Sequence, residues 1–553
     1  MFVCPTIVYN TDVSTIPTTA SVLLMSLCLM MDSSLAENTY YVATTGNNTN
    51  TGLSTNTAFA TLQHAADIVN AGDSVIVLAG RYVGVRIERS GTPDHPITFR
   101  PQLGARVVLD TKSPAEKRDG ILEVETFSGN GIVSHVIVEG FEVVGAERYG
   151  VDVRSTQFVT IRGLTVSNAT VSGIFTPFSH DITIENNTCA YNGEHGIYHN
   201  NSADRFIIRG NHLFENTYSG LHMNGDISVP PPDGLPWVWD GLLSDGIVEN
   251  NLIHENGTGG AGINMDGVVR TIIRNNVLYA TPNNSGIAVF GIDGALASQQ
   301  NMFLNNVVLM AQNSGWCLNI GHGAISNIVF NNIFFHPSNA DGSILIHASA
   351  LEGFECDYNN VKNRFSADGD NSRVDLSTWR ALGFDTHSTV STPVNIFVSH
   401  TTRDYHLRTG SPAIESATVH TAARLDRDGV SRPLDGDNNG LPLGDIGAYE
   451  YIHATANTDG DAHTDAMEQI AGTDATNAMS VLQVSSVAAT NSSVILVWDS
   501  VAGRRYSIYE APDPATFTPS DTNIEATPPR NVFTTSPTNG ATRFFRLGVT
   551  QSP

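Results

Sequence analysis

Side chains that could bind and protonate a substrate recur at two fixed offsets from regularly spaced glycines. The second and fourth positions after Gly196, Gly220 and Gly262 hold Tyr198 and Asn200, His222 and Asn224, and Asn264 and Asp266. Tyrosine and histidine exchange protons with substrates, and asparagine amides bind carboxylates. The same offsets in neighbouring repeats hold Phe175 and Pro177 on one side and Ala288 and Phe290 on the other. We therefore expect a polar centre flanked by apolar surface.

This residue set suits β-elimination from a uronate-containing polysaccharide. Proton abstraction beside a carboxylate needs a base, an acid for the leaving oxygen and a group that binds the carboxylate. We assign His222 and Tyr198 as base and acid, in either order, and Asp266 as the residue that orients the histidine or holds a cation. The expected substrate-binding residues are Asn200, Asn224, Asn264, His199, Trp237, Trp239 and Asp226. The sequence thus predicts a polysaccharide lyase.

Two other functions remain open. Asp226 and Asp266 are expected on adjacent repeats, where they could act as the acid and base of a glycoside hydrolase. A non-catalytic glycan-binding or adhesin protein would use the same groove to bind and release. A uronate substrate would also require a bound cation or positive potential, which we expect near Arg205 and Arg270.

A long insertion follows the His222 segment. Residues 227–245 contain three consecutive prolines and two tryptophans, Trp237 and Trp239. Insertions in repeat proteins often form loops on the binding face. We expect these indoles to stack on sugar rings, whose C–H faces are apolar. The alternative is a loop whose tryptophans only cover the flank of the fold.

The chain as a whole is a tandem repeat. Short apolar runs ending in Gly or Asn return roughly every 24 residues between positions 136 and 360, for example at 184–187, 208–211 and 273–276. Each unit is too small to bury its apolar face alone, so the units must stack. Stacking places the strands in parallel sheets, with asparagines laddered at one turn. The expected fold is all-β, a right-handed parallel β-helix.

The two ends of this region resemble a known superfamily. Residues 40–46, 59–66 and 72–82 are similar to the opening of secreted bacterial right-handed parallel β-helix proteins, which include polysaccharide lyases and epimerases of the pectin lyase-like fold. Residues 404–414 and 444–451 resemble their closing segment. The resemblance implies a carbohydrate-active protein whose open end is capped by a short helix around Leu62–Asn70.

Particular enzymes of this fold match less well. Lysine-dependent lyases are disfavoured, because the lysines, Lys112, Lys117 and Lys362, lie away from the polar centre. The strand 196–201 is similar to one in mannuronan epimerases, but Asn200 stands where their histidine would be. A polygalacturonase-like hydrolase would need an Asp pair and an Arg-Ile-Lys motif that the sequence lacks.

Beyond residue 451 the composition becomes acidic and modular. Residues 452–479 form a linker that resembles the calcium repeats of thrombospondin type 3 and dockerin-like segments. Its expected structural Ca²⁺ ligands are Asp459, Asp461, Asp465 and Glu468, and a second Ca²⁺ could sit in the groove. The alternative is a solvated acidic linker. Alternating residues in 480–553 predict a small β-sandwich.

Charge and targeting signals bound the location and partners. The 553 residues contain 29 Lys and Arg against 55 Asp and Glu, a net charge of −26, which argues against nucleic-acid binding. The apolar run 20–31 is too short to span a membrane and precedes a small-residue cleavage pattern. We expect residues 1–36 to be a signal peptide and 37–451 the β-helix domain. We expect the mature protein to be a secreted or cell-surface monomer that has no transmembrane segment and acts on an extracellular polysaccharide.

Overall fold

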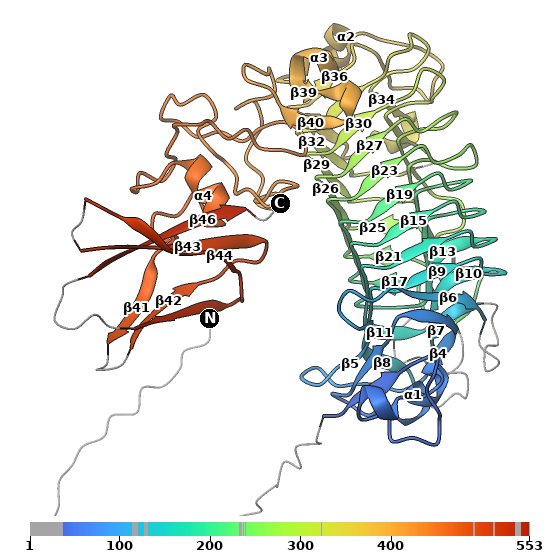
Figure 1. Ribbon diagram of the computed structural model, residues 1–553. Coiled ribbons are helices and arrows are strands. Elements are labelled where there is room, and N and C mark those ends of the chain that lie inside the picture. The colour runs from blue at the N-terminus through green and yellow to red at the C-terminus, as the bar shows by residue number, and fades with distance from the viewer. Residues whose placement is uncertain are drawn as a thin grey trace, which may run out of the picture. The chain divides into compact units, whose positions relative to one another are not determined.

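The computed structural model describes residues 37–112, 120–125, 131–231, 235, 237, 239–321, 323–489, 493–512, 515–536 and 543–551. In these residues three long parallel sheets coil into a right-handed β-helix, and the C-terminal region forms small antiparallel sheets (Figure 1). The predicted fold class is confirmed. The expected signal peptide, residues 1–36, lies outside the described residues.

Each of the three long sheets takes one strand from each coil. The first has the order β1 (Thr39–Val42), β2 (Ser74–Val77), β5 (Ile97–Pro101), β8 (Val133–Glu139), β11 (Thr156–Arg162), β14 (Thr183–Glu185), β18 (Ile207–Arg209), β22 (Ile247–Glu249), β26 (Ile272–Arg274), β29 (Met302–Leu304), β32 (Ile328–Phe330) and β35 (Glu355–Asp357). The second has the order β4 (Val85–Ile87), β7 (Gly120–Val124), β10 (Tyr149–Val153), β13 (Ser172–Pro177), β16 (Ile197–Asn201), β20 (Leu221–Gly225), β24 (Ile263–Asp266), β28 (Ile287–Phe290), β31 (Leu318–Ile320), β34 (Ile344–Ile346) and β37 (Phe365–Ser366). The third has the order β3 (Gly80–Val83), β6 (Val107–Thr111), β9 (Glu142–Val144), β12 (Thr165–Ser167), β15 (Thr188–Ala190), β19 (His212–Phe214), β23 (Leu252–His254), β27 (Val277–Tyr279), β30 (Val307–Leu309), β33 (Ile333–Phe335), β36 (Asn360–Val361) and β38 (Thr389–Val390). A short fourth sheet contains β17 (Ala203–Asp204), β21 (Leu243–Ser244) and β25 (Val268–Val269).

A buried asparagine ladder runs along the turn between the first and third sheets, as the repeat predicts. Its members are Asn187, Asn211, Asn251, Asn276, Asn306, Asn332 and Asn359. Each amide Nδ2 donates to the Oδ1 of the next coil, for example over 3.0 Å from Asn187 to Asn211. The preceding residue, such as Asn186 with φ 56°, adopts the left-handed conformation that asparagine tolerates. The recurring Asn-Asn pair therefore makes a turn and satisfies buried backbone groups.

Both ends of the β-helix core are covered. Helix α1 (Leu62–Ile68), capped by the Thr61 side chain, buries Leu62 and Ala65 in the core at the first end, which confirms the predicted helix. At the other end, α2 (Leu376–Ala381) places the buried Trp379 against Phe365, with ring centroids 4.8 Å apart. Short 3₁₀ turns occur at η1 (Thr55–Thr57), η2 (Ala348–Ala350) and η3 (His400–Thr402).

The chain then returns along the outer face of the third sheet. This returning segment begins with α3 (Pro393–Ile396), β39 (Phe397–Ser399) and β40 (Asp404–Leu407), and it runs to residue 451. Tyr405, Leu407 and Ala448 pack in one apolar cluster with Val277 and Ile333 of the third sheet. The outer face of β27, β30 and β33 is therefore covered by the chain itself.

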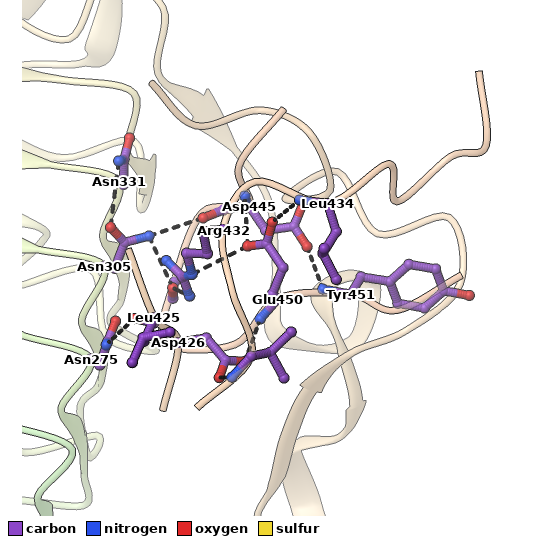
Figure 2. A network of polar contacts seen from close by, with 12 residues as sticks. Asn275, Asn305, Asn331, Leu425, Asp426, Arg432, Leu434, Asp445, Glu450 and Tyr451 are labelled. Carbon is purple, nitrogen blue, oxygen red and sulfur yellow. Dashed lines mark hydrogen bonds and ion pairs between the residues drawn. The ribbon is translucent and has the colours of Figure 1, made fainter. Parts of the chain in front are cut away.

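A polar network fastens the returning segment (Figure 2). Asn275 donates to the carbonyl of Leu425, and Asn305 donates to the carbonyls of Asp445 and Gly447. Beyond these contacts, Arg432 lies 3.2 Å from the Glu450 carboxylate, and both side chains are almost fully buried. Figure 2 shows Asp426 and Asp445 beside this pair. The network, which we call the anchor network, consists of Asp426, Arg432, Asp445 and Glu450.

The linker and the C-terminal module have regular structure of their own. The linker contains α4 (Asp465–Ala471), which the sequence analysis did not predict. The predicted β-sandwich comprises β41 (Val484–Ala489), β42 (Val494–Asp499) and β45 (Arg530–Thr535) in one sheet, and β44 (Thr518–Glu525), β43 (Arg504–Ala511) and β46 (Phe544–Gln551) in the other. Trp498 and Tyr506 are fully buried between them. None of the helices in the described part of the chain has the length and hydropathy of a membrane span.

Candidate functional site

The predicted polar centre forms two adjacent ladders on the outer face of the second sheet. Strand pairing aligns the first ladder as Phe175, Tyr198, His222, Asn264 and Ala288. It aligns the second as Pro177, Asn200, Asn224, Asp266 and Phe290. Alternation along each strand turns the residues between the two ladders toward the core. The register expected from the glycine offsets is thus confirmed.

Tyr198 lies at the middle of the first ladder. Its ring stacks on the His222 ring with centroids 4.8 Å apart and an interplanar angle of 21°. Burial raises the pKa of Tyr198 to about 12, although hydrogen bonds from Asn200 and Asn224 act in the opposite direction. Those amide donors stabilise the ionised phenolate. Tyr198 is therefore a neutral phenol at neutral pH, with two donors in place for a transient negative charge.

His222 is held by a chain of hydrogen bonds. His222 Nδ1 lies 3.0 Å from His195 Nε2, and the Ser219 backbone N–H donates to His195 Nδ1 over 3.3 Å. Burial lowers the pKa of His222 to about 4 and that of His195 to about 2, the latter with a contribution from His222. Both imidazoles are therefore neutral at neutral pH.

The same hydrogen bonds determine which ring nitrogen of each histidine carries the proton. Since Ser219 donates to His195 Nδ1, the neutral His195 carries its proton on Nε2 and donates it to His222 Nδ1. His222 then carries its own proton on Nε2. The Asn264 amide nitrogen Nδ2 lies 3.3 Å from His222 Nε2, so two N–H groups face each other unless the Asn264 amide is turned to place its oxygen there as the acceptor. His222 thus presents an N–H on the side of Asn264.

Sequence reasoning missed His195 and Tyr149. His195 precedes strand β16 and its ring lies 5.2 Å from that of Tyr198. Tyr149, at the start of β10, stacks on Phe175 at 4.1 Å, and Phe175 lies 5.4 Å from Tyr198. Each of them directly precedes a glycine, Gly150 or Gly196, so the positions counted after the glycines did not include them. An aromatic residue just before the glycine was the available signal.

The charged end of the groove was also missed. Beyond Phe175, Asp152 on β10 and Glu123 on β7 are paired in register and buried. Arg154 lies 2.9 Å from the Asp152 carboxylate and 5.1 Å from the centre of the Phe175 ring. The groove therefore changes from ionic side chains to uncharged ones at Phe175.

Asp266 has a different role from the expected one. Its carboxylate is buried and accepts backbone N–H bonds from Ile292 at 2.9 Å, Asp293 at 2.9 Å and Gly294 at 3.3 Å. Burial raises its pKa despite these bonds. Asp266 therefore fixes the turn after β28, and His195 and Asn264 hold His222 in its place.

The other expected aspartate is engaged in the same way. The Asp226 carboxylate accepts bonds from the backbone N–H and the hydroxyl of Ser228, at 2.7 and 2.6 Å. These bonds form a turn at the start of the inserted loop. Asp226 and Asp266, the acid and base of the hydrolase alternative, therefore both use their carboxylates to stabilise turns.

His199 does not face the groove. It is fully buried, its Nδ1 lies 2.7 Å from the Thr176 hydroxyl, and its ring packs on Phe206 at 4.6 Å. Because Tyr198 and Asn200 point outward, strand alternation turns the residue between them inward. The assignment of His199 to substrate binding is therefore corrected.

The two tryptophans of the inserted loop are partly buried. The Trp237 ring lies 4.4 Å from that of the buried His180, which follows strand β13, and the indole nitrogens of Trp237 and Trp239 are both buried. The expected stacking of these indoles on sugars remains a prediction. Their burial fits the alternative, in which the tryptophans only cover the flank of the fold.

The expected arginines are neutralised by neighbours. Arg205 makes two bonds to the Asp181 carboxylate at 2.7 and 2.8 Å. Arg270 makes two bonds to Asp245, both at 2.8 Å. Bidentate pairing of this kind cancels most of the positive potential that a uronate would require.

The linker gathers three of the four expected calcium ligands. Carboxylate oxygens of Asp459, Asp461 and Glu468 lie within 4.8 Å of one another. Glu468 is 1% exposed, its Oε2 makes no hydrogen bond to a described residue, and burial together with the aspartate charges raises its pKa to about 7. Ca²⁺–oxygen distances of roughly 2.3–2.6 Å fit this spacing. Asp465 is outside the trio, because its carboxylate accepts bonds from the N–H and hydroxyl of Thr458.

The N-terminal part of the β-helix matches a known family. Residues 40–183 match the family described as Pel9A-like, right handed beta helix region. No curated protein matches the sequence. The predicted resemblance to right-handed parallel β-helix proteins is confirmed for this part of the chain.

The chain is also similar to solved structures. The crystal structure of pectate lyase Pel9A has a TM-score of 0.50 at 17% sequence identity, covering 75% of this chain and 96% of that one. XylC in complex with xylose has a TM-score of 0.44 at 10% identity, with 74% and 98% covered. A rhamnogalacturonan lyase has a TM-score of 0.41 at 15% identity, with 66% and 91% covered. At these identities the likeness to Pel9A is one of fold.

Proposed function

We propose that this protein is a polysaccharide lyase that cleaves a uronate-containing chain by β-elimination in the groove of the second sheet. The observation that carries the proposal is the stacked Tyr198–His222 pair, neutral and surrounded by Asn200, Asn224 and Asn264. Elimination beside a carboxylate needs a proton carrier and hydrogen-bond donors near the enolate oxygens. The pair and its amides supply both.

Tyr198 is the proton carrier in this mechanism. Its phenolate takes the proton from the carbon beside the carboxylate, the electron pair forms the carbon–carbon double bond, and the bond to the leaving sugar oxygen breaks. The phenol then returns the proton to that oxygen. The amides of Asn200 and Asn224 stabilise the phenolate, because their hydrogen bonds favour the ionised form.

His222 binds the carboxylate with its Nε2–H, beside Asn264. A neutral imidazole N–H is a suitable partner for an oxygen that gains charge, since it donates without bringing a proton that is easily lost. His195 keeps His222 in this tautomer through its bond to Nδ1.

Glycan binding without cleavage is the second candidate. Arg205 and Arg270 are tied to Asp181 and Asp245, so the two arginines expected to attract a uronate are already neutralised. The same aromatic and amide surface would bind an uncharged glycan.

Three further parts of the proposal concern the chain as a whole. A Ca²⁺ ion held by Asp459, Asp461 and Glu468 would stiffen the linker by neutralising three close carboxylates. Export is proposed from the apolar run 20–31, and the mature protein would begin near Glu37 and act as a monomer on an extracellular polysaccharide. N-terminal sequencing of the exported protein tests the start of the mature chain, and light scattering tests whether it is a monomer.

The direct test follows the ultraviolet absorbance of an unsaturated uronate product. The purified protein is incubated with alginate, pectate, ulvan and glycosaminoglycans, with and without Ca²⁺. A rise in absorbance that Tyr198→Phe abolishes establishes elimination. New reducing ends without absorbance indicate hydrolysis, and retention on an immobilised glycan with neither signal indicates a binding protein.

A further inference from the structure

A small hollow opens in the second sheet beside the proposed catalytic pair. Ala288 lies in register between Asn264 on β24 and Asn319 on β31. Because its methyl group is much smaller than the neighbouring side chains, the ladder is interrupted there. The result is a cavity of about 230 Å³ whose lining includes Asn264, Ala288, Phe290, Asn319 and His347.

Two glycines, Gly321 and Gly369, leave room for the His347 ring, which lines the hollow. A Cβ at Gly321 would lie 2.9 Å from the His347 ring, and one at Gly369 would lie 2.7 Å from it. The imidazole therefore occupies space that side chains at these positions would fill. His347 is partly exposed and lines the cavity opposite Asn264 in the order of the strands.

The amides of the lining offer hydrogen bonds without charge. Amides of Asn264, Asn284 and Asn319 contribute to it, and the Asn319 side chain makes no hydrogen bond to a described residue. Phe290 and Ile292 add apolar surface. Among the described residues that line the cavity there is no Lys, Arg, Asp or Glu. Amides beside an aromatic ring are suited to bind a sugar, because its hydroxyl rim needs hydrogen bonds and its C–H faces are apolar.

The size and position point to a single sugar unit. A cavity of about 230 Å³ is smaller than the roughly 300–1,000 Å³ of sites for drug-sized ligands, so it holds one ring. Ala288 is one coil, about 4.8 Å, from Asn264, beside which we place the reacting carboxylate. Because one sugar unit spans a similar length, a ring over Ala288 belongs to the unit next to the reacting uronate.

We infer that the hollow over Ala288 is a subsite for one uncharged sugar unit, adjacent to the uronate that reacts. The inference rests on the proposed function for the identity of the neighbouring unit. It narrows the substrate class to polysaccharides in which an uncharged sugar adjoins the uronate. A uronate in the hollow would meet the amides and the His347 imidazole, with no Lys or Arg in the described lining to balance its carboxylate.

Matched sugar pairs test the inference without turnover. Galactose and galacturonate, and likewise glucose and glucuronate, differ in a hydroxymethyl group against a carboxylate. Calorimetry or ligand-observed NMR with the full chain is expected to show weaker binding of the charged partner by at least about tenfold. Ala288→Leu, which fills the hollow, and Asn319→Ala, which removes a donor, should each weaken the uncharged sugar about tenfold or more.

Two controls keep the outcome clear. Ala295→Leu and Asn313→Ala change exposed residues outside the lining and should leave sugar binding unchanged. Circular dichroism confirms that all variants are folded. Equal binding of charged and uncharged sugars, or binding unaffected by both Ala288→Leu and Asn319→Ala, overturns the inference.

Turnover separates this inference from the proposed function. If the protein eliminates a homopolymer of uronate as fast as an alternating polymer and Ala288→Leu has no effect, the lyase proposal stands and the subsite fails. If no polymer yields an unsaturated product, yet Tyr198→Phe retains sugar binding that Ala288→Leu loses, the subsite stands and the lyase proposal fails.

Discussion

The groove and the anchor network both contain groups with strongly shifted pKa values, but they leave those groups in different states. In the anchor network, Asp426, Asp445 and Glu450 are at most 5% exposed, and their carboxylates accept backbone N–H bonds, for example from Val430, Tyr451 and Leu434. In the groove, Tyr198 and His222 are partly exposed and uncharged. Shifted pKa values therefore indicate burial in both regions. The groove differs from the anchor network because its shifted groups, Tyr198 and His222, are partly exposed to a ligand.

The charge balance of the two regions also differs. The anchor network sets three carboxylates against one arginine, and burial raises the pKa of Glu450 to about 7 and that of Asp445 well above its usual range. In the centre of the groove the carboxylate of Asp266 is occupied by the turn after β28 and faces no arginine partner among the described residues. We expect mutations in the network to change stability and mutations in the groove to change activity.

The largest expected effect is loss of activity in the groove. Tyr198→Phe removes the proton carrier and should lower the rate of product formation about 10²–10⁴-fold, measured by ultraviolet absorbance. Tyr191→Phe is the matched control, because Tyr191 is 52% exposed and directly follows β15 of the third sheet. Equal activity in Tyr198→Phe and Tyr191→Phe would show that Tyr198 is not the proton carrier.

The second expected effect is loss of stability in the network. Arg432→Met leaves the buried carboxylates without a counter-charge and should lower the free energy of local opening of residues 425–451 by about 3–5 kcal/mol, measured by hydrogen exchange. Arg81→Met, which breaks the exposed pair with Asp110, should cost less than about 1 kcal/mol. Per-molecule activity should be unchanged in both variants. A selective loss of activity in Arg432→Met would contradict the distinction between the regions.

The third prediction concerns the pH dependence of the reaction. If the phenolate of Tyr198, whose pKa is raised to about 12, takes the proton, then kcat/KM should rise about tenfold per pH unit from about pH 7 to pH 9. If His222 were the base, its pKa of about 4 would make the profile flat over that range. The measured slope therefore decides which of the stacked residues carries the proton.

The smallest expected effect is the pH dependence of stability. Glu450 has a folded-state pKa of about 7, above the usual 4.5, so the folded protein binds more protons than the unfolded one between these values. Its contribution is complete below about pH 4.5 and is lost as the pH rises through about 7. Thermal unfolding should therefore occur at lower temperature at about pH 8 than at about pH 5, by the equivalent of about 1–3 kcal/mol. Glu450→Gln should reduce this slope, and an unchanged slope would place the titrating group elsewhere.

The repeat and the alternation of the strands were readable in the sequence. The positions of Tyr198, His222 and Asn264 in one ladder follow from the glycine offsets, because coils of similar length stack in register. The asparagine ladder followed for the same reason. A period of two along each strand also turned His199 inward, which contradicted its assignment to the groove.

Only the tertiary structure decided which partners those side chains have. His195 reaches His222 from a turn, three backbone N–H groups 26 to 28 residues away occupy Asp266, and Asn305 meets the returning segment 140 residues later. These contacts depend on irregular turns and on packing between distant segments, which the local pattern does not encode. The sequence therefore determined the fold and the register of the candidate site, whereas folding determined the protonation states, the turn-bound carboxylates and the hollow over Ala288.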